Sequence, residues 1–320
     1  MNDDFIEPLD ETGRWRARDV SYSRGIWEKL KPLLPTFTME EFRASDKTPP
    51  NPYMRSVVRQ PRSLFEQPIP VGVVSNTYGL SQHAEVVEQC LAGIKSAGIS
   101  TRNLTCEIGL TELGEWMNLR IYFPEQFQHR PLDDQPLGLR LECFNSVDGT
   151  SRLVVLLGWL RFVCSNGMVI GETKTGFRDV HNQDIDLAAI PEVIEYGLQL
   201  VKQDIARLQH WQQTSVGLGD IEEWADEPLA GAWGKKAACR VFHICESGKD
   251  VEITDPFAKV PPTKKPWKVL QAVPGAPSPA KTIYDVSQAL SWVASKRNNP
   301  EERVEWQTAI PRLIDRLNAA

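Results

Sequence analysis

Trp116-Met-Asn-Leu-Arg-Ile-Tyr-Phe123 is the stretch that decides the fold, because its apolar and polar residues alternate with a period of two. Met117 and Leu119 fall on one side of an extended chain, and Asn118 and Arg120 fall on the other. The pattern predicts a strand of an antiparallel sheet with one buried face and one solvated face.

Three neighbouring segments, Asn103–Leu110, Gly138–Asn145 and Ser151–Leu157, are also predicted strands. Asp148-Gly149 between the last two predicts a tight turn, because glycine adopts the positive φ that hairpin loops need. These segments form an antiparallel meander rather than an alternating βαβ unit. We therefore predict an α+β fold, with a β-meander flanked by long helices, an extended N-terminal arm and a helical C-terminal region.

Two helices are expected to flank the meander. Apolar residues recur every three or four positions over Gln82–Ser96, with Ser81 as a candidate N-cap. The same periodicity extends over Leu187–Gln213 and predicts a second, longer helix. The expected organisation comprises an N-terminal arm (1–70), the α+β core (71–213), a helical extension (214–255), a proline-rich linker (256–280) and a C-terminal helical pair (281–320).

The charge distribution is uneven within a net charge of −6. Residues 12–65 hold 11 Lys/Arg and 5 Asp/Glu, whereas residues 179–230 hold 2 Lys/Arg and 11 Asp/Glu. This asymmetry has three interpretations. The basic arm binds a polyanion, it docks on the acidic helix of its own chain, or the charges belong to an ordinary solvated surface.

The sequence offers little that points to chemistry. It has no phosphate-binding glycine loop, no nucleophile elbow and no metal-binding histidine spacing, so no cofactor or metal is expected. The six cysteines are scattered in apolar segments, which is typical of buried thiols, and no membrane span or secretory signal is recognisable. We expect a cytoplasmic protein. Whether it is an enzyme stays open, and a binding protein without catalysis fits these observations better.

Arg161-Phe-Val-Cys164-Ser-Asn166-Gly167, with Arg178 and His181 following, resembles the signature of a large family. That family is carried by phages, prophages and plasmids and is catalogued as a domain of unknown function. Further pieces of the chain resemble the family's entry strand and its hairpin, and they contain Asn76, Tyr78, Asp148 and Gly149. The resemblance brings no established chemistry. The residue types of the segment predict a tight structural corner at Cys164, Asn166 and Gly167, followed by a charged loop.

The order of helix, meander and helix is similar to that of ring-forming single-strand-annealing recombination proteins. This analogy favours a mobile-element accessory protein that binds or anneals single-stranded DNA without catalysis, as a homo-oligomer. The candidate phosphate contacts are Arg161, Lys174, Arg178, His181, Arg120, Arg140, Arg152, Arg55, Arg59 and Arg62. Candidate stacking surfaces are Trp116, Tyr122 and Phe144.

Two alternatives remain open. One is a protein–protein interaction factor in plasmid maintenance or phage defence, for which tryptophans 224, 233, 267, 292 and 306 would serve as interface anchors. The other is a hydrolase centred on Cys164 and His181. Neither alternative involves a membrane.

Overall fold

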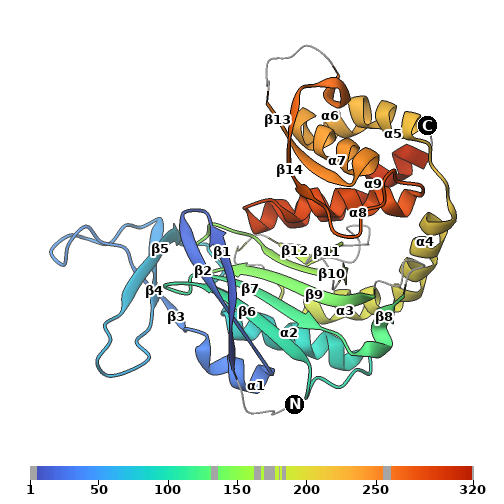
Figure 1. Cartoon of the computed structure of the whole chain (residues 1–320). Helices are drawn as coiled ribbons and strands as arrows, with labels where there is room; N and C mark the ends of the chain where they lie inside the picture. Colours follow the sequence, from blue (N-terminus) through green and yellow to red (C-terminus); the bar gives the residue numbers. More distant parts are fainter. Residues whose placement is uncertain are drawn as a thin grey trace. The chain divides into compact units, whose positions relative to one another are not determined.

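The computed structural model describes residues 6–130, 136–161, 167–168, 177–179, 181, 185–254 and 261–318, and only the backbone at 10–13, 160–161, 167–168, 177–179 and 300–301. The chain divides into two compact units (Figure 1). Unit 1 comprises Met1–Gln126, Arg140–Leu157 and Lys174–Gln199, and unit 2 comprises Phe127–Leu139, Gly158–Thr173 and Leu200–Ala320.

The fold is of the α+β class and is built on an antiparallel meander. The main sheet has the strand order β1 (Glu7–Trp15), β2 (Arg18–Gly25), β6 (Thr105–Thr111), β7 (Trp116–Tyr122), β9 (Leu137–Ser146), β10 (Leu153–Arg161) and β11 (Gly167–Met168). Two short strands join it: β8 (Gln128–His129) pairs with β9, and β12 (Phe177–Asp179) pairs with β10. Strands β6, β7, β9 and β10 match the four predicted strands to within a few residues at each end.

Helices α2 (His83–Ser96) and α3 (Ala189–Gln199) lie against one face of this sheet (Figure 1). They pack closely, since a Cβ atom on Gly93 would lie 2.8 Å from the Cα atom of Pro191. The N-cap of α2 is Gln82, one residue later than predicted, and its N–H donates to Glu85 Oε2 at 3.2 Å. The sequence therefore predicted α2 almost in full.

The predicted long helix over residues 187–213 is in fact two helices, α3 and α4 (Val201–Gln213). Leu200 separates them with a ψ of −9°, far from the roughly −42° of a continuous helix. The hydrogen-bond ladder restarts there, because the N–H groups of Gln203 and Asp204 both donate to the Leu200 carbonyl. Apolar periodicity continues across the break, which is why the sequence did not reveal it.

The N-terminal 70 residues contain much more regular structure than the predicted arm. Strands β1 and β2 extend the main sheet, with β2 paired to β6 from Val20↔Thr111 to Gly25↔Cys106. After a short helix α1 (Trp27–Leu30) and a 3₁₀ turn η1 (Lys31–Leu33), a second antiparallel sheet follows, made of β3 (Phe37–Glu41), β4 (Met54–Arg59) and β5 (Ile69–Ser75).

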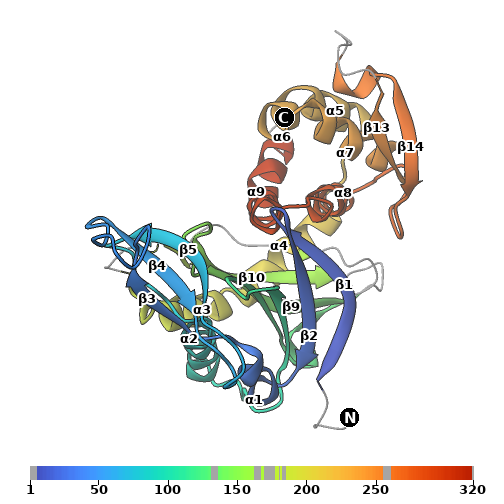
Figure 2. The ribbon, with the colours of Figure 1, turned by 90° about the vertical axis from the view of Figure 1, so that its left-hand side faces the viewer.

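Figure 2 shows β3, β4 and β5 as a layer of their own within unit 1. Its inner side carries a small core of Phe37, Val57, Val71, Val74 and Val147, closed by the buried ring of Tyr78. The β4–β5 loop, residues 61–68, is exposed throughout. This sheet therefore has one packed side and a prominent solvent-exposed loop.

Unit 2 is mainly helical. Its helical elements after α4 are α5 (Leu218–Trp224), a π-helical segment η4 (Ala225–Leu229) around Pro228, α6 (Ala230–Trp233), α7 (Lys235–Ser247), α8 (Ile283–Ser295) and α9 (Pro300–Asn318). Buried Trp224 joins α5 to α9 by donating from Nε1 to the Leu313 carbonyl at 3.1 Å. The predicted C-terminal helical pair corresponds to α8 and α9.

The proline-rich segment predicted as a linker contains a strand. After the 3₁₀ turn η5 (Pro262–Lys264), β14 (Trp267–Ala272) pairs antiparallel with β13 (Lys249–Ile253). All five cysteines in the described ranges are buried free thiols. Across the same ranges no helix is both long and apolar enough to cross a membrane.

Candidate nucleic-acid interface

A row of alternating charges crosses four strands of the main sheet. Cross-strand pairing places Arg24 of β2 beside Glu107 of β6, Glu107 beside Arg120 of β7, and Arg120 beside Glu142 of β9. Arg24 Nη2 lies 2.6 Å from Glu107 Oε1, and Arg120 lies 3.3 Å from Glu107 and 3.6 Å from Glu142. We refer to these four residues as the charge row.

Three of the four residues of the charge row are buried, although the strand pattern predicted a solvated face, and Arg24 at its end is half-buried. Glu107, Arg120 and Glu142 are only 2%, 5% and 3% exposed. The correction has a physical reason: charges from neighbouring strands neutralise one another, so this face does not need water to stabilise them. Alternation along one strand cannot reveal such compensation.

Side chains next to the charge row complete its neutralisation. Arg140 Nη2 donates to Glu142 Oε2 at 2.7 Å, and the Tyr122 hydroxyl donates to Glu107 Oε2 at 2.8 Å. Burial raises the pKa of Tyr122 to about 12. The Arg120 guanidinium also lies 4.7 Å from the centre of the Tyr22 ring. Arg120 and Arg140, two predicted phosphate contacts, are thus held by carboxylates within the sheet.

The aromatic residues predicted to stack on bases are also enclosed. Trp116 is fully buried and stacks on Trp15, with ring centres 4.8 Å apart and planes 8° apart. Phe144 is also fully buried, with its ring centre 5.8 Å from that of Trp116. The rings of Trp116 and Phe144 therefore lie in the protein interior, and Tyr122 is half-buried with its hydroxyl bound to Glu107.

The turn predicted at Asp148-Gly149 is a tightly packed corner. Gly149 has a φ of +75°, which favours glycine, and a Cβ atom there would lie 3.2 Å from Val74 Cγ1. Asp148 accepts from the Thr150 N–H at 3.1 Å and pairs with Arg18, also at 3.1 Å. Arg18 contacts Glu115 as well, a partner that the sequence did not suggest.

Other signature residues meet at this corner. The Tyr78 hydroxyl donates to the Ser146 carbonyl at 3.0 Å, and the Tyr78 ring stacks on His181 at 5.2 Å. His181 is buried, with Nδ1 3.2 Å from the Gly79 carbonyl oxygen. Asn76 anchors the start of the turn by donating from Nδ2 to the Pro52 carbonyl. The structure therefore brings Tyr78, Asp148, Gly149 and His181 into one packed region, and Asn76 is exposed two residues before Tyr78.

The remaining signature residues are only partly within the described ranges. Cys164, Asn166 and Lys174 lie outside them, so the proposed Cys164–His181 pair has no described geometry. Arg161 ends β10, Gly167 begins β11 and Arg178 lies in β12, with the backbone alone described at all three. Arg152, just before β10, is exposed.

The small sheet of unit 1 carries the three remaining predicted phosphate contacts, Arg55, Arg59 and Arg62. Arg55 is the second residue of β4 and is exposed, with no ion pair among the residues that the structure describes. Arg59 ends β4, and its guanidinium lies 3.6 Å from Glu66. Arg62 follows in the loop, where partial burial and the nearby charge of Arg59 lower its pKa. Two arginines thus lie close together with a single carboxylate between them.

Exposed aromatic rings accompany these arginines, and the sequence reasoning missed them. Tyr53, two residues before Arg55, is 74% exposed, and Phe65, three residues after Arg62, is 96% exposed. The signal that could have found Phe65 is its setting, an apolar Leu64-Phe65 pair inside a proline-rich loop between two strands. We call Tyr53, Arg55, Arg59, Arg62 and Phe65 the arginine–aromatic surface.

The five C-terminal tryptophans predicted as interface anchors differ in their environments. Trp224 and Trp292 are buried within unit 2. Trp233 and Trp306 are half-buried and stack on each other. Trp267 is 41% exposed on β14, with its ring centre 4.7 Å from that of His243. Only Trp267 therefore has the exposure expected of an interface anchor.

Comparison with known proteins gives a family but no activity. The model of the family described as "Domain of unknown function (DUF932)" matches residues 70–276, which is more than half of the chain. No curated protein and no solved structure matches the chain.

Proposed function

We propose that this chain, which belongs to the DUF932 family, binds single-stranded DNA through the arginine–aromatic surface and performs no chemistry of its own. The observation that supports this most is the combination of closely spaced arginines and exposed aromatic rings along β4 and at the two ends of that strand. Proteins that bind single strands combine cations that contact phosphates with rings on which bases stack.

The dimensions of the surface support the proposal. Arg55 and Arg59 are four positions apart in β4, a distance of about 13 Å at roughly 3.3 Å per residue. Both lie on the same side of the strand as Val57, which is the packed side of the sheet; Arg55 is exposed at its end, whereas the Arg59 side chain is 14% exposed. Tyr53 precedes this line and Phe65 follows it. A short run of nucleotides would therefore meet rings at both ends and guanidinium groups between them.

The charge row argues against the main sheet as the interface. Arg24 and Arg120 are already paired with the buried carboxylates Glu107 and Glu142, so a phosphate would have to displace those partners. Arg55 has no such competitor in the described ranges. This difference is the reason to place the proposed contacts on the small sheet.

The role in a mobile element, as a recombination or annealing accessory acting as a homo-oligomer in the cytoplasm, is part of the same proposal. It rests on the likeness of the signature around Arg161–His181 to proteins of phages and plasmids and on the order of helix, meander and helix. It predicts that the DNA bound is single-stranded and that binding tolerates changes of base sequence.

The decisive experiment measures the anisotropy of a fluorescent oligothymidine as the full-length protein is added, over a range of salt concentrations. Three phosphate contacts predict a slope of about −2 for log affinity against log salt, because each contact adds about −0.7 on a single strand. Replacing Arg55 and Arg62 together by alanine should bring the slope close to −0.7 and weaken binding at low salt.

The matched control is Arg102→Ala, which removes an exposed arginine that has no ion pair in the described ranges and lies outside the small sheet. Its affinity and slope should equal those of the wild type. An absence of DNA binding at low salt would overturn the proposal. So would a loss of DNA affinity in Arg102→Ala equal to that of the double arginine variant.

The exposed Leu64 favours a second candidate function, docking of another protein on the same loop. Leu64 is 99% exposed, and an aliphatic side chain offers no ring on which a base stacks. Phe65→Leu separates the two functions. It keeps an apolar side chain for a protein partner but removes the stacking face, so DNA affinity falls by about 1–3 kcal/mol only if DNA is the ligand.

A further inference from the structure

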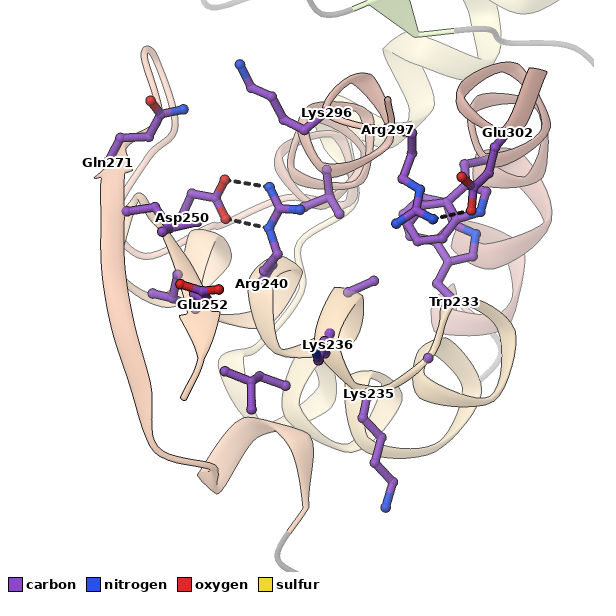
Figure 3. Close-up of a pocket in the computed structure, with 17 residues that line it drawn as sticks. Trp233, Lys235, Lys236, Arg240, Asp250, Glu252, Gln271, Lys296, Arg297 and Glu302 are labelled. Atoms are coloured by element: carbon purple, nitrogen blue, oxygen red, sulfur yellow. Dashed lines mark hydrogen bonds and ion pairs between the residues drawn. The ribbon is translucent and has the colours of Figure 1, made fainter. Parts of the chain in front are cut away.

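Unit 2 contains a pocket of about 910 Å³ that the DNA interface does not use (Figure 3). It is lined by the start of α7, both strands of the β13–β14 hairpin, the end of α8 and the start of α9. Its volume falls in the range of roughly 300–1,000 Å³ that is typical of small-molecule sites. All its lining residues belong to unit 2, so its geometry stands by itself.

Stacked aromatic rings form one wall of the pocket. The ring centres of Trp233 and Trp306 lie 4.5 Å apart with planes 18° apart, and the Arg297 guanidinium lies 4.3 Å from the Trp306 ring centre. Figure 3 shows this stack at one side of the lining, with Arg297 paired to Glu302. Both tryptophans are half-buried, so part of the ring surface remains open. Such a wall suits a planar, π-rich ligand group.

The acidic groups of the pocket are largely neutralised by the pocket itself. Asp250 accepts two hydrogen bonds from Arg240, at 2.8 and 2.7 Å, and a third from Trp292 Nε1 at 2.9 Å. Figure 3 shows the Arg240–Asp250 pair in the middle of the lining. Glu302 is paired with Arg297. Glu252 is the remaining carboxylate of the lining.

Three lysines of the lining have no ion pair among the described residues: Lys235, Lys236 and Lys296. All three are exposed, and Lys296 lies over the Trp292 ring at 4.2 Å. Three lysines against a single unpaired carboxylate give the pocket a positive balance. A negatively charged ligand would therefore be favoured over a neutral one.

The backbone at the start of α7 adds to this preference. Gly234 precedes the helix with a φ of +83°, and no side chain caps the first turn. The N–H groups of that turn lack acceptors within the helix and carry the positive end of its dipole. They include the N–H groups of Lys235 and Lys236, which follow Trp233 by two and three residues. Positive charge and an aromatic ring thus come from neighbouring parts of the lining.

We propose that this pocket binds a nucleoside phosphate, with the base against the Trp233–Trp306 wall and the phosphate near Lys235, Lys236 and the start of α7. The pairing of a half-buried ring with cations two and three residues further along the chain matches a ligand whose base and phosphate are joined by one sugar. Neither half of such a ligand would bind well alone, because each would meet only part of the lining.

The test is calorimetric titration of the full-length protein with ADP, AMP, adenosine and inorganic phosphate separately. ADP should bind at least tenfold more tightly than adenosine or phosphate. Replacing Lys235 and Lys236 together by alanine should weaken ADP binding at least tenfold, and Trp233→Leu should weaken ADP and adenosine alike while leaving phosphate binding unchanged.

Lys281→Ala is the matched control, since Lys281 is an exposed lysine of unit 2 outside the pocket, and it should bind ADP like the wild type. The lysine changes are on the surface, and an unchanged melting temperature will show that the variants fold. Absence of ADP binding at millimolar concentration would overturn the inference. ADP binding that the double lysine variant retains in full would also overturn it. The Arg55 and Arg62 variant should still bind ADP, which distinguishes this site from the DNA interface.

Discussion

At the scale of single residues, His83 shows how a buried polar group is satisfied inside this fold. It begins α2, is fully buried, and uses both ring nitrogens. Nε2 lies 2.8 Å from the Gly114 carbonyl oxygen, and Nδ1 lies 2.9 Å from Asn145 Nδ2. A neutral ring fits this pair, with Nε2 donating and Nδ1 accepting. A second proton would have no acceptor.

This environment predicts a loss of stability in acid. Burial, with a smaller contribution from the charge of nearby His181, lowers the pKa of His83 from 6.5 to about 4. Below pH 6.5 the unfolded chain therefore binds a proton that the folded chain does not bind until about pH 4. The free energy of unfolding should fall by about 3 kcal/mol between pH 7 and pH 4 from this residue, because each pKa unit corresponds to about 1.4 kcal/mol.

Urea unfolding of the wild type and of His83→Gln at several pH values measures this effect. Glutamine offers both a donor and an acceptor, so the variant should show a shallower pH dependence between pH 6.5 and 4. His129, whose pKa is also lowered by burial, provides the comparison variant His129→Gln. Equal pH dependence in His83→Gln and the wild type would contradict the assignment.

At the scale of elements, the sequence predicted the strands of the meander but misjudged one face of them. The alternation in residues 116–123 located β7 correctly and identified its apolar side. It could not show that Arg120 has Glu107 and Glu142 as neighbours, because that depends on the register of three strands. The same limit applies to β2, whose partner β6 lies about eighty residues further along the chain.

The charge row should make Arg120 one of the residues most sensitive to substitution in the sheet. Arg120→Met leaves two buried carboxylates with one positive partner fewer, and removing one member of a buried ion pair typically costs about 3–5 kcal/mol. Arg152→Met, at an exposed arginine just before β10, should change stability by no more than about 0.5 kcal/mol. Chemical denaturation of both variants measures their free energies of unfolding. Similar losses of stability in the two would show that the charge row contributes little to the stability of the fold.

At the scale of the whole molecule, the candidate sites depend on structure that local patterns do not encode. Arg55, Arg59 and Arg62 were recognisable from the basic composition of the N-terminal segment, but the sheet that displays them was not. The pocket of unit 2 joins residues from position 233 to position 306, including β14 from a segment predicted as a linker. Its assembly depends on tertiary contacts, which no local pattern in the sequence reveals.

The two compact units predict that unfolding of the chain is not a single two-state transition. Each has its own buried core, with the small-sheet cluster and the charge row in unit 1 and Trp224, Leu290 and Ile310 among the core of unit 2. Calorimetry should give a total enthalpy that exceeds the van't Hoff value. Arg120→Met should lower the melting temperature of the transition of unit 1. Trp292→Phe, which removes a hydrogen bond to buried Asp250, should lower that of unit 2. If both variants shift one common transition equally, the units unfold together and this division does not describe how the chain loses its structure.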